Sequence, residues 1–254
     1  VDDAVTKEKA LAITTDVYDL LAKPWQQALA KAADAVENAG RRPAERGTSG
    51  DAAVPGMALS KAVETILAWN GEYTQDSVAA ALVYAWRLAC EDHVDIAAIA
   101  EGRPLSEADR RTLIHKLTET LERFEQWYGQ RDVTFGETHV VGRGDTFYPH
   151  DGADYGDDEN LTETLWCVMD EERPKGSGRY VAFQGSMAPM LMFFHKDGIE
   201  SYSCVPWGQS GDPDSPHYMD QGRDLYSKRQ LKPTWFARDA LEAHVTTTKV
   251  LARP

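Results

Sequence analysis

Residues 202–232 read YSCVPWGQSGDPDSPHYMDQGRDLYSKRQLK, and the interpretation of the whole chain depends on this stretch. It contains three prolines, three glycines, a histidine and several carboxylates, although sequence typical of strands lies on either side. Such a segment is too polar for a core strand, and its prolines and glycines predict fixed turns. Two interpretations follow: a catalytic centre, or a rigid connection between core elements.

The composition limits the classes of partner. The chain has 254 residues, a length that fits one large domain or two small ones. Its formal net charge of -14 argues against nucleic acid and against an anionic membrane surface, because both require a cationic face. No apolar run approaches the roughly 18 residues of a membrane span, and no signal peptide is recognisable. We therefore expect neither nucleic acid nor a membrane as a partner.

The first half of the chain has the apolar periodicity of helices. Pro24 predicts a break in the first helical run, and Ser77 is expected to cap the third. Ser106 with Asp109 predicts a capping box, and Gly129 predicts the end of the last helix. Helical spacing covers residues 7–38, 59–69, 78–90 and 106–129, with a surface loop expected at 41–55. We therefore expect a helical region over residues 1–129.

The second half alternates with the period of strands. Asp197-Gly198 between two alternating runs predicts a hairpin. Strands are expected at residues 138–141, 165–169, 180–185, 190–195, 200–205 and 245–251, with a short helix at 237–244. Helices followed by antiparallel strands predict an α+β fold, with an antiparallel β region over residues 130–254. We expect the two regions to form one structural unit.

The stretch offers one candidate nucleophile. Gly208-Gln209-Ser210-Gly211 approaches the GxSxG motif of serine hydrolases, but Asp212 occupies the position of the second glycine. Prolines follow instead of a helix. A structural turn is therefore favoured, and an independent enzyme that uses Ser210 and His217 is the weakest of the functional hypotheses.

Two other features suggest chemistry. The run from Asp145 to Glu159 is rich in carboxylates and glycine, which suits calcium, but it lacks the ligand order of an EF-hand. An acidic solvated loop is favoured. Cys167 and Cys204 lie in strand-like runs and either form a disulfide or stay free, and free buried thiols are favoured. The methionines of residues 186–192 either line an apolar pocket or pack in the core, and core packing is favoured.

Several motifs resemble one known family. Residues 208–213 (GQSGDP), 215–218 (SPHY), Asp220-Gln221 and Lys232-Pro233 are similar to the C-terminal signature of the penicillin acylase family of N-terminal nucleophile hydrolases. Residues 67–71 (LAWNG) and 135–139 (FGETH) are similar to upstream passages of that family. The SPHY-x-DQ form is most similar to the branch of acyl-homoserine lactone acylases and aculeacin-type acylases.

The resemblance implies an αββα core and a nucleophilic serine that self-cleavage frees as the first residue of the β subunit. It also implies an oxyanion hole made by an asparagine side chain and a backbone N–H. None of these groups, and no calcium ligand, matches a residue of this chain, and Val1 has no hydroxyl or thiol. We therefore expect no catalytic, cofactor-binding or metal-binding residue here, and no cofactor.

The resemblance thus implies the C-terminal part of a β subunit, inactive alone and partnered by the N-terminal remainder of the same periplasmic or secreted acylase. The whole enzyme would cleave an acyl amide such as an N-acyl-homoserine lactone, a lipopeptide or a β-lactam side chain. The alternative is a non-catalytic binding or structural module that retains this fold. Either form is expected to expose an apolar core face, through which a homodimer would form.

Overall fold

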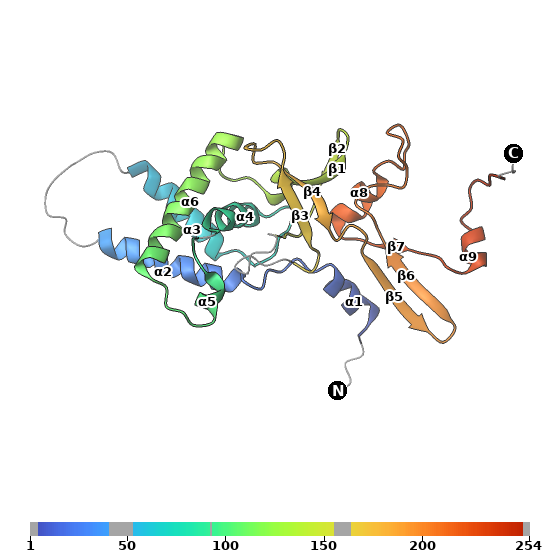
Figure 1. The fold of residues 1–254 in the computed structure, drawn as a ribbon, viewed down its shortest axis with the longest axis horizontal. Helices are drawn as coiled ribbons and strands as arrows, with labels where there is room; N and C mark the ends of the chain where they lie inside the picture. Colours follow the sequence, from blue (N-terminus) through green and yellow to red (C-terminus); the bar gives the residue numbers. More distant parts are fainter. Residues whose placement is uncertain (1–4, 41–52, 92, 155–163, 251–254) are drawn as a thin grey trace.

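The computed structural model describes residues 5–40, 53–91, 93–154 and 164–250. Most helices gather at one end of the molecule, two sheets follow, and a C-terminal arm extends from the far end (Figure 1). The helices that precede the sheets are α1 (Lys7–Thr14), α2 (Ala22–Gly40), α3 (Ala53–Leu67), α4 (Val78–Cys90), α5 (Ile96–Ala100), α6 (Glu107–Tyr128) and α7 (Phe135–Thr138). No helix in the described part is both long and apolar enough to cross a bilayer.

The helix ends confirm the predicted caps. The hydroxyl of Ser77 accepts from the N–H of Ala80 at the start of α4, and Ser106 with Asp109 forms the capping box of α6. Gly129 ends α6 in the left-handed conformation, with φ 66°. The break near Pro24 falls earlier than predicted, because α2 begins at Ala22 and a proline in the first turn costs no helical hydrogen bond.

The helical core is built from buried aromatic rings. Trp25 of α2 packs edge-on against Trp86 of α4, with ring centroids 5.2 Å apart, and both are fully buried. The indole N–H of Trp86 donates to the carbonyl of Leu113 in α6. Aromatic pairs in this geometry contribute about 0.5–1.5 kcal/mol beyond the area they bury. These contacts hold α2, α4 and α6 together as one layer.

Two sheets follow the helices. The first has the order β2-β1-β4-β3, with β1 parallel to β4 and the other pairs antiparallel. The second has the order β5-β6-β7, and the predicted hairpin pairs His195 with Gly198. The strands are β1 (His139–Arg143), β2 (Thr146–Pro149), β3 (Val168–Glu172), β4 (Tyr180–Gly185), β5 (Met190–His195), β6 (Gly198–Ser203) and β7 (Lys232–Pro233). The α+β prediction is confirmed.

Some local predictions are wrong. Residues 245–250 form no strand, because this exposed segment lies in the arm and pairs with no described strand. The run expected to be one acidic loop contains β2, and its residues 155–159 lie outside the described part. Of the loop predicted at 41–55, residues 53–55 belong to α3 and 41–52 lie outside the described part.

Within residues 202–232 the backbone folds back on itself, so that residues 208–210 lie beside residues 217–218. Gly208 donates its N–H to the carbonyl of Tyr218, and Ser210 donates to the carbonyl of His217. The guanidinium of Arg143 donates to the carbonyls of Ser210 and Tyr218 and lies 4.1 Å from the centre of the Tyr218 ring. The helices α8 (Asp220–Asp224) and η1 (Tyr226–Lys228) complete the block, and α9 (Arg238–Glu242) lies in the arm.

Gly208 is required by this close approach. A Cβ at Gly208 would lie 1.9 Å from the carbonyl oxygen of His217, whereas a Cβ at Gly211 would meet no atom within 4 Å. Backbone cannot move aside as the end of a flexible side chain can. The glycine at position 208 therefore permits the contact on which the turn depends.

We predict that Gly208→Ala lowers the free energy of unfolding by about 1–3 kcal/mol or more, the range of overpacked sites. Gly211→Ala is the matched control and is expected to lie within about 1 kcal/mol of the wild type, because its Cβ enters open space. Urea unfolding of both variants measures the difference. Equal stability of the two variants would show that the close approach is not a constraint.

Candidate functional site

The hydroxyl of Ser210, the candidate nucleophile, is hydrogen-bonded within the turn. The hydroxyl of Ser210 accepts from the N–H of Asp212 at 3.1 Å, and its contact with His217 joins backbone atoms only. The imidazole Nδ1 of His217 lies 2.8 Å from the carboxylate of Asp220, which also accepts from the N–H of Gln221. These contacts favour the structural turn over the serine-hydrolase hypothesis. Asp220 thus anchors a backbone N–H, whereas the His217 side chain bonds a carboxylate.

The other candidates do not converge on a reactive centre. Among the described residues no group of three histidine, cysteine or acidic side chains could hold a metal ion. Cys90, Cys167 and Cys204 are all free thiols, so the disulfide is not formed. Burial raises the pKa of Cys90 and of Cys204 to about 12, which keeps both as unreactive thiols at neutral pH.

The structure brings together a buried polar cluster that the sequence did not indicate. His139 on β1, His150 after β2 and Asp170 on β3 are almost completely shielded from solvent. The Nε2 of His150 lies 3.1 Å from one carboxylate oxygen of Asp170, and the Nε2 of His139 lies 3.8 Å from the other. Two imidazoles thus flank one carboxylate inside the first sheet.

The hydrogen bonds of the two rings fix where the proton lies. The Nδ1 of His150 lies 3.1 Å from the carbonyl oxygen of Asp151, which can only accept, so this nitrogen carries a proton. A further proton must then lie between His150 and Asp170, since both facing atoms would otherwise be acceptors. Burial disfavours the imidazolium form, but the Asp170 carboxylate outweighs burial and raises the pKa of His150.

His139 behaves in the opposite way. Its ring is stacked between Phe135, with centroids 3.8 Å apart, and Tyr180, at 4.7 Å. Burial, reinforced by the charge of His150, holds the pKa of His139 well below its usual value. A neutral His139 therefore lies between two aromatic faces and joins α7 to the first sheet.

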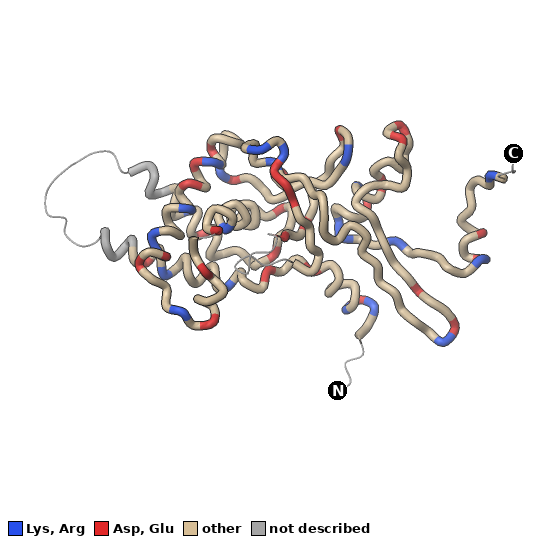
Figure 2. Tube along the Cα trace, viewed as in Figure 1, with Lys and Arg blue, Asp and Glu red and all other residues tan. Residues whose placement is uncertain are grey.

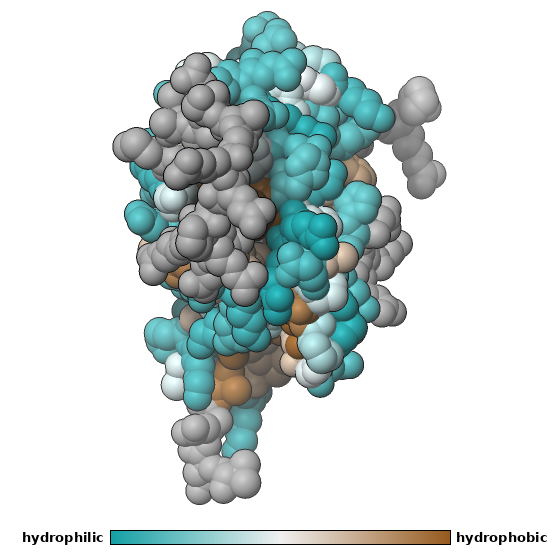
Figure 3. Space-filling model, turned by 90° about the vertical axis from the view of Figure 1, so that its left-hand side faces the viewer, coloured by the Kyte–Doolittle hydropathy of each residue, from teal (hydrophilic) through white to brown (hydrophobic). Residues whose placement is uncertain are grey.

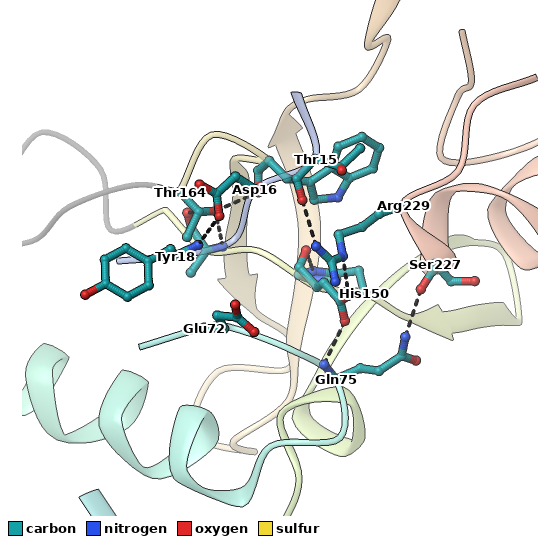
Figure 4. Close-up of polar contacts among 12 residues, drawn as sticks. Thr15, Asp16, Tyr18, Glu72, Gln75, His150, Thr164, Ser227 and Arg229 are labelled. Carbon is teal, nitrogen blue, oxygen red and sulfur yellow. Dashed lines mark hydrogen bonds and ion pairs between the residues drawn. The ribbon is translucent and has the colours of Figure 1, made fainter. Parts of the chain in front are cut away.

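A second polar cluster joins four segments (Figure 4). One carboxylate oxygen of Asp151 accepts from the N–H of Gln75 at 2.7 Å, and the other accepts from the guanidinium of Arg229 at 2.7 Å. Arg229 also donates to the carbonyl of Thr15, and the amide of Gln75 donates to the carbonyl of Ser227. We call this set of five residues the Asp151 joint. It ties the loop before α4 and the segment after α1 to residues 202–232, which we call the signature stretch.

Arg229 has an unusual backbone conformation. Its φ of 52° lies in the left-handed region, which costs a residue with a side chain about 1–2 kcal/mol. Arg229 is the C-cap of η1, where its N–H donates to the carbonyl of Tyr226, and its guanidinium makes two further bonds. Arg229 is thus held by bonds to Asp151 and Thr15 at the end of the signature stretch.

Neither polar cluster offers chemistry to a substrate. His139, His150, Asp170 and Asp151 are buried among protein groups, and a general base must reach a substrate proton. The sequence did not reveal these residues, because single polar residues in strand-like runs give no local signal. Only the fold brings Asp151 and Arg229 together, 78 positions apart.

One sheet face is apolar and exposed. Met190, Met192 and Phe194 alternate along β5 and expose 61%, 39% and 76% of their surfaces. The predicted core packing of the methionines is therefore wrong for Met190 and Met192. Ile199, which pairs with Phe194 across the hairpin, is also exposed. By contrast, the visible surface of the helical end is largely hydrophilic (Figure 3).

Charged residues form no comparable surface in the part of the chain that the structure describes. Lys and Arg alternate with Asp and Glu along the chain, and the most compact acidic segment lies on β3 (Figure 2). Several of the described ion pairs at the surface, such as Arg173 with Glu171, join residues close in sequence, whereas Lys61 with Asp132 joins distant ones. Exposed pairs of this kind contribute little to stability. Among the described surface features, the exposed apolar face of β5 is therefore the one that best fits a protein contact.

The fold is α+β, and the described contacts of residues 202–232 stabilise a turn. The family profile described as penicillin amidase matches residues 2–243, nearly the whole chain. The chain therefore belongs to the penicillin amidase family, a family of acylase-type amide hydrolases.

The opposite pKa shifts of His139 and His150 predict that the free energy of unfolding is largest at about pH 6.5. Because the pKa of His139 is lowered in the folded state, the unfolded chain binds its proton first, and stability falls as the pH drops below about 6.5 by up to about 1.4 kcal/mol per pH unit. Because the pKa of His150 is raised, its contribution is complete below about 6.5 and is lost as the pH rises through the raised value.

His139→Phe should keep the ring stack and remove the titrating group. We expect its loss of stability between about pH 6.5 and pH 5 to be smaller than that of the wild type, as measured by urea unfolding at several pH values. His115→Phe is the control, because His115 is exposed on α6. An acid dependence unchanged by His139→Phe would rule out this histidine as its source.

Proposed function

We propose that this chain is the C-terminal part of a penicillin-acylase-type amidohydrolase and that it acts as scaffold for a nucleophile carried elsewhere in the enzyme. Family membership supports the reaction class, and the residues of this chain offer no match to the family's nucleophile or oxyanion asparagine. The buried Asp151 joint and the hydrogen-bonded hydroxyl of Ser210 support a structural role. The chain alone is then inactive.

The observation that carries this proposal is the apolar face of β5. A strand of six residues with no acidic residue, lysine, arginine or proline, at the edge of a three-stranded sheet, is a surface that proteins normally cover. The remainder of the acylase is the partner that would cover it. The two sheets would then become part of a larger αββα core.

The whole enzyme would hydrolyse the amide between an acyl chain and an amine-bearing head group, without a redox cofactor. The SPHY-x-DQ form of residues 215–221 supports the branch that acts on N-acyl-homoserine lactones and lipopeptides, with β-lactam side chains as the remaining class. Its location would be periplasmic or secreted, as in that branch.

The test is reconstitution. The chain is expressed alone and together with the polypeptide encoded immediately upstream of Val1, and hydrolysis of an N-acyl-homoserine lactone and of an acylated peptide is measured. We expect turnover only when both parts are present. Turnover by the chain alone would contradict the proposal, and a soluble complex without turnover would favour the non-catalytic module.

A matched pair of variants tests the apolar face. Phe194→Asp should weaken association between the two parts, because it places a charge in the proposed contact. Leu20→Asp is the control, because Leu20 is equally exposed at 76% but lies in the segment before α2. Co-purification measures the effect. Equal loss in both variants, or in neither, would remove the face of β5 from the interface.

A further inference from the structure

Two acceptor atoms face each other in the interior of the first sheet. The Nε2 of His139 on β1 and the Oδ2 of Asp170 on β3 lie 3.8 Å apart, which is too far for a hydrogen bond. Both side chains are almost completely shielded from solvent, and neither atom has a hydrogen-bond partner in the described part of the chain. Because β4 lies between β1 and β3 in the sheet, the pair connects two strands that share no backbone hydrogen bonds.

The contacts of Nδ1 show that Nε2 carries no proton in the neutral His139 ring. The Nδ1 lies 3.3 Å from the carbonyl oxygen of Phe135, which can only accept, so Nδ1 carries the proton of the neutral ring. The hydroxyl of Thr138 donates to the same carbonyl, and its oxygen accepts from Nδ1 at 2.7 Å. The Nε2 atom is therefore an acceptor.

The Oδ2 of Asp170 is an acceptor as well. The other carboxylate oxygen, Oδ1, already lies 3.1 Å from the Nε2 of His150. A buried acceptor without a donor is unfavourable, and two acceptors that face each other repel. One proton between Oδ2 and the Nε2 of His139 would satisfy both atoms at once.

The groups around the His139 ring explain why this proton is absent at neutral pH. Tyr84 of α4 and Tyr180 of β4 contact the ring, with centroids 4.4 Å and 4.7 Å from it. Burial raises the pKa of Tyr180 to about 12, so this phenol stays uncharged. Burial, reinforced by the charge of His150 at a centroid distance of 6.1 Å, lowers the pKa of His139 and opposes a second imidazolium.

The groups around Asp170 favour proton uptake in acid. Burial raises the pKa of Asp170 in spite of His150, and the carboxylate of Asp154 adds to this shift. Tyr226 of η1 is uncharged, because burial raises the pKa of its phenol. Two carboxylates thus stand against the one imidazolium of His150, so a further proton would balance the charge of the group.

We propose that His139 and Asp170 form a proton-binding site that acts as an acid-sensitive latch between β1 and β3. At neutral pH the latch is open. When the pH falls, one proton enters between Nε2 and Oδ2, and these atoms approach by about 1 Å to form a charge-assisted hydrogen bond. Because His139 stacks on Phe135, closure also shifts the contact between α7 and the sheet. The device uses residues of this chain alone and is independent of the proposed acylase function.

NMR of the full chain locates the proton. The ¹⁵N shifts of the His139 ring are followed as the pH is lowered from about 7.5. We expect a proton on Nδ1 and none on Nε2 at the start, and then protonation of Nε2 while the chain is still folded. A proton on Nε2 at about pH 7.5, or an Nε2 that stays unprotonated until the chain unfolds in acid, would overturn the proposal.

Variants test the partner of this proton. Asp170→Asn removes the facing carboxylate and should lower the proton affinity of His139 by about tenfold or more, which is one pKa unit. Glu172→Gln is the matched control, because it removes the same charge from β3 at a side chain that accepts from the N–H of Gly178. An equal fall in both variants, or in neither, would contradict the latch. If Asp170→Asn does not fold, the ring shifts of the wild type still decide.

Discussion

The carboxylate of Asp151 is the contact on which the arrangement of the chain depends. Its two oxygens hold Gln75, ahead of α4, and Arg229, at the end of the signature stretch, while Arg229 also reaches Thr15. The carboxylate is buried, so its removal would leave the Nε–H of Arg229 and the backbone N–H of Gln75 without their described partner. Segments separated by as many as 214 positions thus meet at one side chain.

This constraint changes the meaning of the signature stretch. Its density of glycine, proline, histidine and aspartate suggests an active site, yet Gly208 permits a close backbone contact and Ser210 stabilises a turn. The stretch lies within the 2–243 match to the penicillin amidase family, and its described contacts fix the geometry of a turn. The exposed apolar face of β5 is where the proposed remainder of the acylase would pack.

The sequence predicted the features that are determined by interactions between residues close together in the chain. The caps at Ser77 and Ser106 and the hairpin at Asp197 were evident because short-range hydrogen bonds and turn preferences determine them. It did not predict the pairing of His150 with Asp170 or the joint at Asp151, since these join residues far apart. The strand predicted at residues 245–251 failed because alternation alone provides no partner strand.

The most direct test measures hydrogen exchange in Arg229→Met. If the Asp151 joint holds the helical and sheet parts together, amide protection should fall in α4 as well as in the signature stretch. Arg223→Met provides the comparison, because Arg223 is exposed and pairs with the adjacent Asp224. The account predicts a loss of protection in both regions for Arg229→Met and unaltered protection for Arg223→Met. A loss confined to the signature stretch, with α4 fully protected, would contradict it.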